Sequence, residues 1–172
     1  IPEKEWQAFI PSEPKKGQQQ EVPVSFALRL FRFHLDPCRG VTEGTAFTNS
    51  KSDAGRLTLT VDEATPERLV LRLEGKADLK QAGKDEPSIY QPSLLGLLVY
   101  DRTSKSFTRF DLLALGTASG LPRDANGVVM EKGPYPLGIA FELVVRPTAA
   151  EHLHPRGARD YPASYLEPKE SR

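Results

Sequence analysis

The feature of this sequence that most constrains its fold is an alternation of apolar and polar residues between Gly55 and Leu79. The alternation runs in two arms, separated by the turn-forming segment 64–67, Ala-Thr-Pro-Glu. Its apolar members are Leu57, Leu59, Val61, Leu69, Leu71, Leu73, Ala77 and Leu79. A period of two is typical of a strand with one face on a core and one in water, whereas a helix needs a period of 3.6. The segment therefore predicts an antiparallel hairpin, with Arg72 and Glu74 on its outer face.

Four further segments carry strand-like patterns. Residues 24–35 alternate on one parity up to Leu30 and on the other from Phe31, which predicts a strand with a β-bulge at that point. The dense apolar run 94–100 predicts a strand buried on both faces. Residues 107–115, ending at Gly116, predict its partner, and the alternation 137–145 predicts a last strand.

These patterns together predict an all-β fold. We expect an antiparallel meander, closed as a barrel or folded as a sandwich, with extended N- and C-terminal arms. The predicted organisation is an N-terminal arm and linker (1–23), a β domain (24–147) and a C-terminal extended tail (148–172). A length of 172 residues suits one domain of this kind.

Composition narrows the classes of partner. Lys plus Arg and Asp plus Glu both total 23, so the formal net charge is zero, which argues against nucleic acid as a partner. No apolar run approaches the ~18 residues that a transmembrane helix needs, so we expect no transmembrane segment. The chain starts at Ile1, which a cleaved signal peptide, a propeptide cut or a domain excerpt would produce. We expect an extracellular or periplasmic location, with the cytoplasm as the alternative.

No familiar catalytic motif is present, which lowers the odds of an enzyme and indicates no cofactor. The sequence has no glycine-rich phosphate loop, no Gly-x-Ser-x-Gly and no His-Glu-x-x-His. A metal site would need residues from two distant segments to converge, and the four possible ligands are His34, Cys38, His152 and His154. Asp36 would share a polar strand face with His34 if the bulge is present. The simpler interpretation gives His34 and Asp36 a surface role, Cys38 a buried one and the two tail histidines none, so no metal is expected.

Aromatic side chains in the arms and loops are the candidates for partner binding. They are Trp6, Phe9, Tyr135, Tyr161 and Tyr165. Such residues anchor either a partner protein or another subunit, or fix an arm to its own domain. We therefore expect any protein partner, or the protein's own subunits, to bind through the terminal arms.

Three functions remain open at this point. The first is a non-catalytic β module of the cell envelope or extracellular space that binds proteins or surfaces. The second is a carrier that encloses an apolar small molecule in a β-barrel or clam, for which the leucine-rich inner face is the supporting feature. The third is a metal-dependent or hydrolytic enzyme using His34, Asp36 and Cys38. The volume of an enclosed apolar pocket is the observation that separates the second from the first.

Overall fold

The computed structural model describes residues 3–36, 54–81, 87–121, 132–149, 151 and 162–167. The strands in these ranges are β1 (Gln19–Glu21), β2 (Gly55–Ala64), β3 (Arg68–Ala77), β4 (Leu79–Gln81), β5 (Ser88–Asp101), β6 (Ser106–Ser119) and β7 (Tyr135–Phe141). The helical segments are α1 (Glu3–Gln7), α2 (Val24–Arg29), the π-helix η1 (Leu30–His34) and α4 (Pro162–Leu166). None of these helices is long and apolar enough to cross a membrane.

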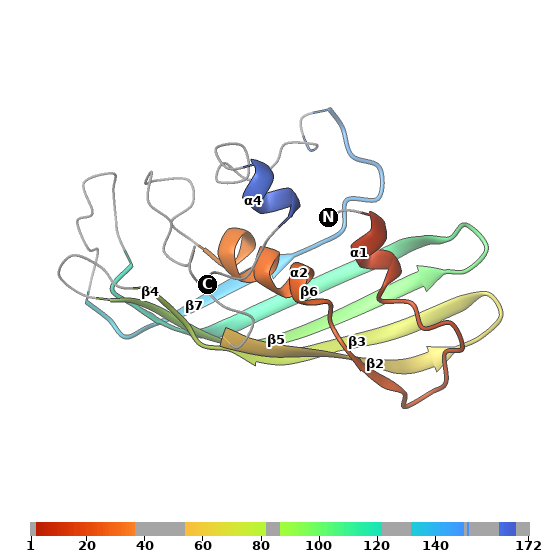
Figure 1. Cartoon of the computed structure of the whole chain (residues 1–172), viewed down its shortest axis with the longest axis horizontal. Helices are drawn as coiled ribbons and strands as arrows, with labels where there is room; N and C mark the ends of the chain where they lie inside the picture. The colour runs from red at the N-terminus through yellow and green to blue at the C-terminus, as the bar shows by residue number, and fades with distance from the viewer. Residues whose placement is uncertain are drawn as a thin grey trace.

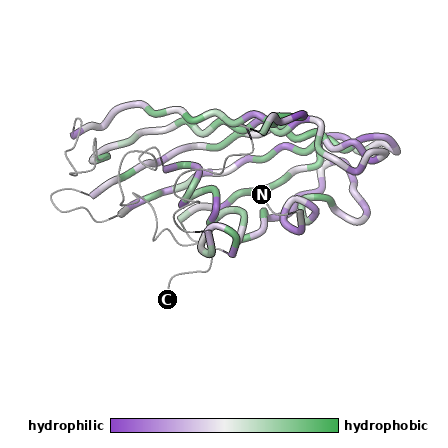
Figure 2. The backbone as a smooth tube through the Cα atoms, turned by 90° about the horizontal axis from the view of Figure 1, so that it is seen from above, coloured by the Kyte–Doolittle hydropathy of each residue, from purple (hydrophilic) through white to green (hydrophobic). Residues whose placement is uncertain are grey.

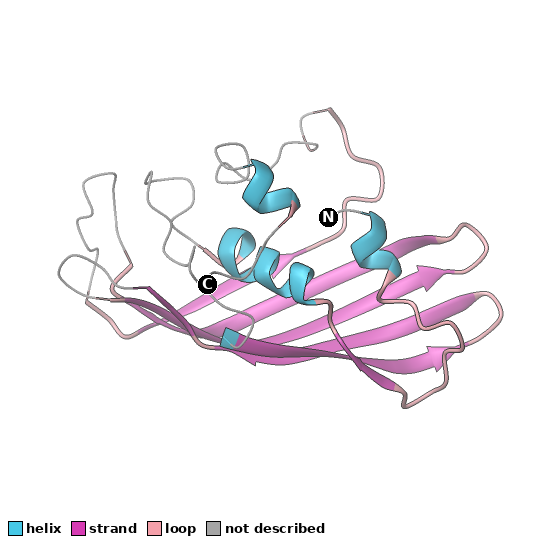
Figure 3. Cartoon of the chain, viewed as in Figure 1, coloured by secondary structure: helices cyan, strands magenta, loops and turns pink. Residues whose placement is uncertain are grey.

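All of the described strands belong to one antiparallel sheet, which Figures 1 and 3 show as a long curved layer. The strand order is β1-β2-β3-β5-β6-β7, and the short β4 pairs with the first residues of β5. The prediction of a mainly antiparallel β fold is confirmed. The sheet is not closed as a barrel, because β1 and β7 lie at opposite ends of this order and do not pair with each other.

The helical segments lie on one face of the sheet, as Figure 2 shows from above. We call this the helical face and the other the open face. The core lies between the helices and the sheet, and its fully buried side chains include Phe9, Phe31, Leu69, Leu73 and Tyr90. α1 and β1 both lie within the segment predicted as an arm and linker. Phe9 belongs to the same segment and is buried in the core, so N-terminal residues contribute directly to it.

The hairpin predicted from the alternation is confirmed as β2 and β3. Leu59 pairs with Leu73, and Val61 with Leu71, so both rows of apolar side chains point to the helical face. Arg72 lies on the open face, where it forms ion pairs with Asp62 and Glu74. The two faces therefore separate apolar and charged residues as the period of two requires.

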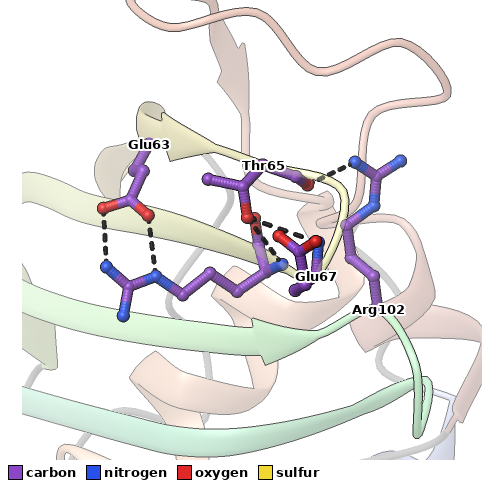
Figure 4. A network of polar contacts seen from close by, with 5 residues as sticks. Glu63, Thr65, Glu67 and Arg102 are labelled. Atoms are coloured by element: carbon purple, nitrogen blue, oxygen red, sulfur yellow. Dashed lines mark hydrogen bonds and ion pairs between the residues drawn. The ribbon is translucent and has the colours of Figure 1, made fainter.

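The predicted turn of this hairpin is built by its own side chains (Figure 4). The Thr65 hydroxyl accepts hydrogen bonds from the backbone N–H groups of Glu67 and Arg68, at 3.3 and 3.1 Å. Arg68 forms an ion pair with Glu63 across the turn. Arg102, from the turn after β5, donates to the Thr65 carbonyl at 2.7 Å and so joins the two neighbouring turns.

The prediction of a bulged strand over residues 24–35 is wrong, because this segment is helical. It forms α2 and then η1, and Leu35 N–H closes the last turn on the carbonyl of Leu30. Nearly every side chain from Phe26 to Leu35 is buried, including those on the helix's outer side. A helix enclosed in this way has no polar face, so its apolar residues do not show a clear period of 3.6.

Two other strands differ from their predicted form. β5 is buried on the helical face only, since Leu94 is 3 % exposed whereas Leu95 is 55 % exposed. β6 does not end at Gly116. A side chain there would meet the carbonyl oxygen of Gln91 at 2.1 Å, so glycine permits a close approach within a continuing strand. The last strand, β7, is shorter than predicted and ends at Phe141.

Candidate functional site

A cleft of about 460 Å³ lies between the helical layer and the β6–β7 part of the sheet. The volume is within the range of roughly 300–1,000 Å³ that is typical of small-molecule sites. Its walls come from α1, α2, η1, β6, the end of β7 and the chain that follows it, which are brought together from distant parts of the sequence. The lining residues are mostly apolar: Trp6, Phe26, Leu30, Phe107, Phe110, Leu112, Phe141 and Leu143, with Arg29, His34, Ser106 and Glu142 as the polar members.

A cluster of aromatic rings forms one wall of the cleft. The ring of Trp6 lies edge-on to that of Phe107, with centroids 5.8 Å apart, and Phe107 lies edge-on to Phe110 at 5.9 Å. Phe26, from α2, lies 6.4 Å from Phe110 and 4.9 Å from the fully buried Phe9. Edge-to-face packing of this kind fixes each ring against its neighbours. The wall is therefore largely formed before any ligand arrives.

The polar end of the cleft is organised by Arg29, the last residue of α2. Its Nε donates to the carbonyl of Tyr165 at 2.6 Å, and its Nη2 to the carbonyl of Leu166 at 3.0 Å. Its Nη1 forms an ion pair with the carboxylate of Glu5 in α1. One guanidinium thus joins three helical segments, and both charged side chains are almost completely buried. Desolvation lowers the pKa of Arg29, opposed by its interaction with Tyr165.

His34 lies beside this network at the end of η1. Its Nε2 is hydrogen-bonded to the hydroxyl of Tyr165 at 3.1 Å. Burial is the main cause that lowers the pKa of His34 to about 4, and the positive charge of Arg29 adds to it. The imidazole is therefore neutral at neutral pH. Burial also raises the pKa of the Tyr165 hydroxyl, and the Tyr165 ring packs edge-on to Phe33 at 5.2 Å.

The aromatic residues singled out in the sequence take different places. Trp6 lines the cleft, and Phe9 is completely buried in the core. Tyr135 packs against the core from β7, and Tyr165 is 5 % exposed. Tyr161 lies outside the described residues. The four described aromatics thus contact their own domain, and their role in binding a partner stays a prediction.

The possible metal ligands are only partly described. His34 and Asp36 do not share a strand face as the bulged strand required, because the chain there is helical up to His34. Cys38, His152 and His154 lie outside the described residues, so their convergence on His34 stays a prediction. Among the residues that the structure places, no three His, Cys, Asp or Glu side chains form a group able to hold a metal ion.

Acidic residues near the hairpin turns act in the turns and strands themselves. Asp101 accepts hydrogen bonds from the N–H groups of Thr103 and Ser104, both at 2.8 Å, which lowers the pKa of its carboxyl group. Asp111 forms an ion pair with Arg109 on the open face. These contacts are typical of turn and surface carboxylates.

A second hollow lies on the open face, around exposed leucines of β5 and β6. Leu95 and Leu113 line this hollow and are directly opposite each other in the ladder. Leu115 lies two residues further along β6 on the same face. Their exposed fractions are 55, 45 and 56 %. The ion pair between Arg109 and Asp111 borders them. This arrangement is an apolar patch with charges of both signs at its edge.

Sequence reasoning identified Trp6 and His34 but missed most of the cleft. Phe107, Phe110 and Phe141 fall within segments that the sequence predicts only as strands, and Arg29 falls within the segment 24–35 predicted as a bulged strand. The density of aromatic residues in segment 107–110 was the available signal.

Comparisons with protein-family models, with curated proteins and with solved structures find no match to this chain. Its function is therefore inferred from the geometry of the cleft.

Proposed function

We propose that this domain is a carrier that binds an apolar small molecule reversibly in the cleft between α2–η1 and β6–β7. The observation that carries the proposal is the lining itself: eight of the twelve lining side chains are apolar, and five of these are aromatic. Apolar surface that stays in water costs about 25 cal/mol per Å², so a ligand that covers this surface gains affinity by removing it from water. Preformed walls reduce the ordering cost of binding.

Chemistry on the ligand is not what the cleft favours. His34, the lining group best suited to acid or base work, is hydrogen-bonded to the Tyr165 hydroxyl, and the Arg29 guanidinium binds Glu5 and two carbonyls. Binding without reaction fits this set of contacts. The predicted location outside the cytoplasm remains part of the proposal.

The test uses N-phenyl-1-naphthylamine, an uncharged dye that becomes fluorescent in apolar surroundings. Trp6 is the only tryptophan of the chain and lies in the cleft wall, so a dye bound there should quench its emission by energy transfer. We expect saturable binding of one dye per chain, with dye emission rising as Trp6 emission falls.

A matched pair of variants locates the dye. Leu143→Trp adds bulk to the cleft wall and should abolish the rise in directly excited dye emission. Leu113→Trp makes the same change on the open face and should leave it intact. Dye binding that is lost with Leu113→Trp and kept with Leu143→Trp would overturn the proposal.

A second candidate function is self-association through the open face, as an alternative to a carrier. It is favoured by Leu95 and Leu113, which are exposed cross-strand neighbours, and by the adjacent Arg109 and Asp111. A patch bordered by both charges is complementary to a second copy of itself across a two-fold axis. Sedimentation should then show a dimer that Leu113→Lys dissociates, and a native chain that remains monomeric at high concentration excludes this function.

A further inference from the structure

The cleft contains a cationic side chain whose charge is already neutralised. Arg29 is 1 % exposed, and its three nitrogens donate to Glu5 and to the carbonyls of Tyr165 and Leu166. A guanidinium is the group that most often binds a carboxylate ligand in an apolar pocket, since its fork matches the two oxygens. Here Glu5, a residue of the chain itself, occupies that position.

Among the described lining residues, the other polar groups supply no positive charge at neutral pH. His34 is neutral, because its pKa lies at about 4. The Ser106 hydroxyl is hydrogen-bonded to that of Ser104 at 2.8 Å. Glu142 is an exposed residue at the rim, next to the end of β7. Because the charges of Arg29 and Glu5 cancel, the carboxylate of Glu142 gives the described lining a net negative charge.

We propose that the cleft accepts uncharged apolar molecules, rejects organic acids of the same size, and owes this selectivity to Glu5. The inference rests on the proposed function and names its ligand class. An acid that entered would lose part of its hydration, meet no free cation among the described residues that line the cleft, and approach Glu142. A neutral alcohol of equal length loses little hydration and can donate its hydroxyl hydrogen to the Glu142 carboxylate.

Glu5 acts on selectivity without lining the cleft. It comes from α1, immediately before Trp6, and its carboxylate reaches Arg29 from behind the wall. Removing its charge while keeping its shape should therefore turn a site for neutral ligands into one that accepts acids. Such a gain of binding is a result that simple damage to the fold does not produce.

The experiment measures displacement of bound N-phenyl-1-naphthylamine by 1-decanol and by decanoate at pH 7, below the concentrations at which either aggregates. For the native chain, decanol should displace the dye at about tenfold lower concentration than decanoate, a difference of about 1.4 kcal/mol. In Glu5→Gln the decanoate midpoint should fall by about tenfold, with decanol unchanged.

Two further variants keep the test independent of the buried pair. Glu142→Lys places a cation at the exposed rim and should also improve decanoate binding severalfold, even if Glu5→Gln does not fold. Glu13→Lys makes the same charge change at an exposed residue away from the cleft and should alter neither ligand.

The outcomes separate the two proposals. Decanoate binding to the native chain as tightly as decanol overturns the selectivity and leaves the carrier proposal standing. A folded Glu5→Gln variant whose decanoate midpoint does not fall overturns the role of Glu5. An equal gain for decanoate with Glu13→Lys and Glu142→Lys also overturns it, because the effect would then be one of net charge. If neither the dye nor decanol binds the native chain, the carrier proposal itself fails.

Discussion

Arg29 and Glu5 form an ion pair across two helices, with side chains that are 1 % and 4 % exposed. The pair lies on the helical face, where water is largely excluded, and the remaining donors of Arg29 are directed at the carbonyls that end α4. A buried pair of this kind adds little net stability, but losing one partner leaves an uncompensated charge in the interior. The contact therefore fixes the relative placement of α1, α2 and α4.

The first prediction concerns this pair. Glu5→Ala should lower the free energy of unfolding by roughly 3–5 kcal/mol, because the Arg29 charge would stay buried alone. Glu63→Ala, which breaks the exposed pair with Arg68, should change the free energy of unfolding far less, because water and salt screen that pair. Urea unfolding followed by circular dichroism measures both. If the two substitutions lower the free energy of unfolding equally, the Glu5–Arg29 contact does not hold α1 on the domain in solution.

A second prediction compares two neighbouring leucines of β5. Leu94 points to the core and Leu95 to the open face. Leu94→Ala should cost about 2–5 kcal/mol through lost burial and a cavity, while Leu95→Ala should stay within about 0.5 kcal/mol. Thermal or urea unfolding of both variants is the measurement. A large loss at Leu95 would mean that its face is covered in solution, as self-association requires.

The N-terminal segment gives a third prediction. Phe9 has no exposed surface and packs edge-on to Phe26, so Phe9→Ala should cost roughly 3–5 kcal/mol. Val24→Ala, at a side chain that is 52 % exposed, is the matched control and should change little. Deleting residues 1–11 should therefore destabilise the β domain, in contrast to the behaviour of a detachable arm. A truncated chain that unfolds at the same urea concentration as the full chain contradicts this.

A fourth prediction follows from the pKa of His34. The folded value, about 4, lies below the ordinary 6.5, so the unfolded chain binds a proton more readily than the folded one between these pH values. The contribution of His34 to stability is full above pH 6.5 and is lost as the pH falls towards 4, by up to about 3 kcal/mol.

The measurement is urea unfolding of the native chain and of His34→Gln across this pH range. Subtracting the free energy of unfolding of His34→Gln from that of the native chain at each pH removes the contribution of carboxylates that titrate in the same pH range. We expect the native chain to lose more stability than the variant on acidification, and an NMR titration of the imidazole should give a midpoint well below 6.5. Parallel pH profiles of the two proteins would contradict the low pKa.

How much of this structure could be predicted depends on how each element is exposed. The β2–β3 hairpin could be predicted, because one face is in water and Arg72 therefore alternates with Leu71 and Leu73. α2 and η1 could not be, because burial on nearly all sides removes the polar face by which a helix shows its period. Chance placement of Phe26 and Leu28 two residues apart then imitates a strand.

The cleft was beyond sequence reasoning for a different reason. Trp6, Leu30, Phe110 and Leu143 belong to four segments whose proximity depends on the order of strands and on the helices above them. No local pattern encodes that proximity. Arg29 shows the same limit, since its identity as a buried residue depends on Glu5 and on carbonyls more than 130 positions away.

Among the described strands, β7 has an unpaired outer edge, and this has a consequence for the rate at which a ligand of the proposed carrier can leave. The wall of the cleft at Phe141 and Leu143 belongs to this edge strand and to the chain just after it, with no further described strand beyond. A ligand that leaves past β7 breaks no hydrogen bonds between strands, whereas a ligand that leaves a closed barrel through its wall requires two strands to separate. Residence time should therefore be governed by how tightly the ligand fits, and exchange should stay rapid in variants that make the domain far more resistant to unfolding.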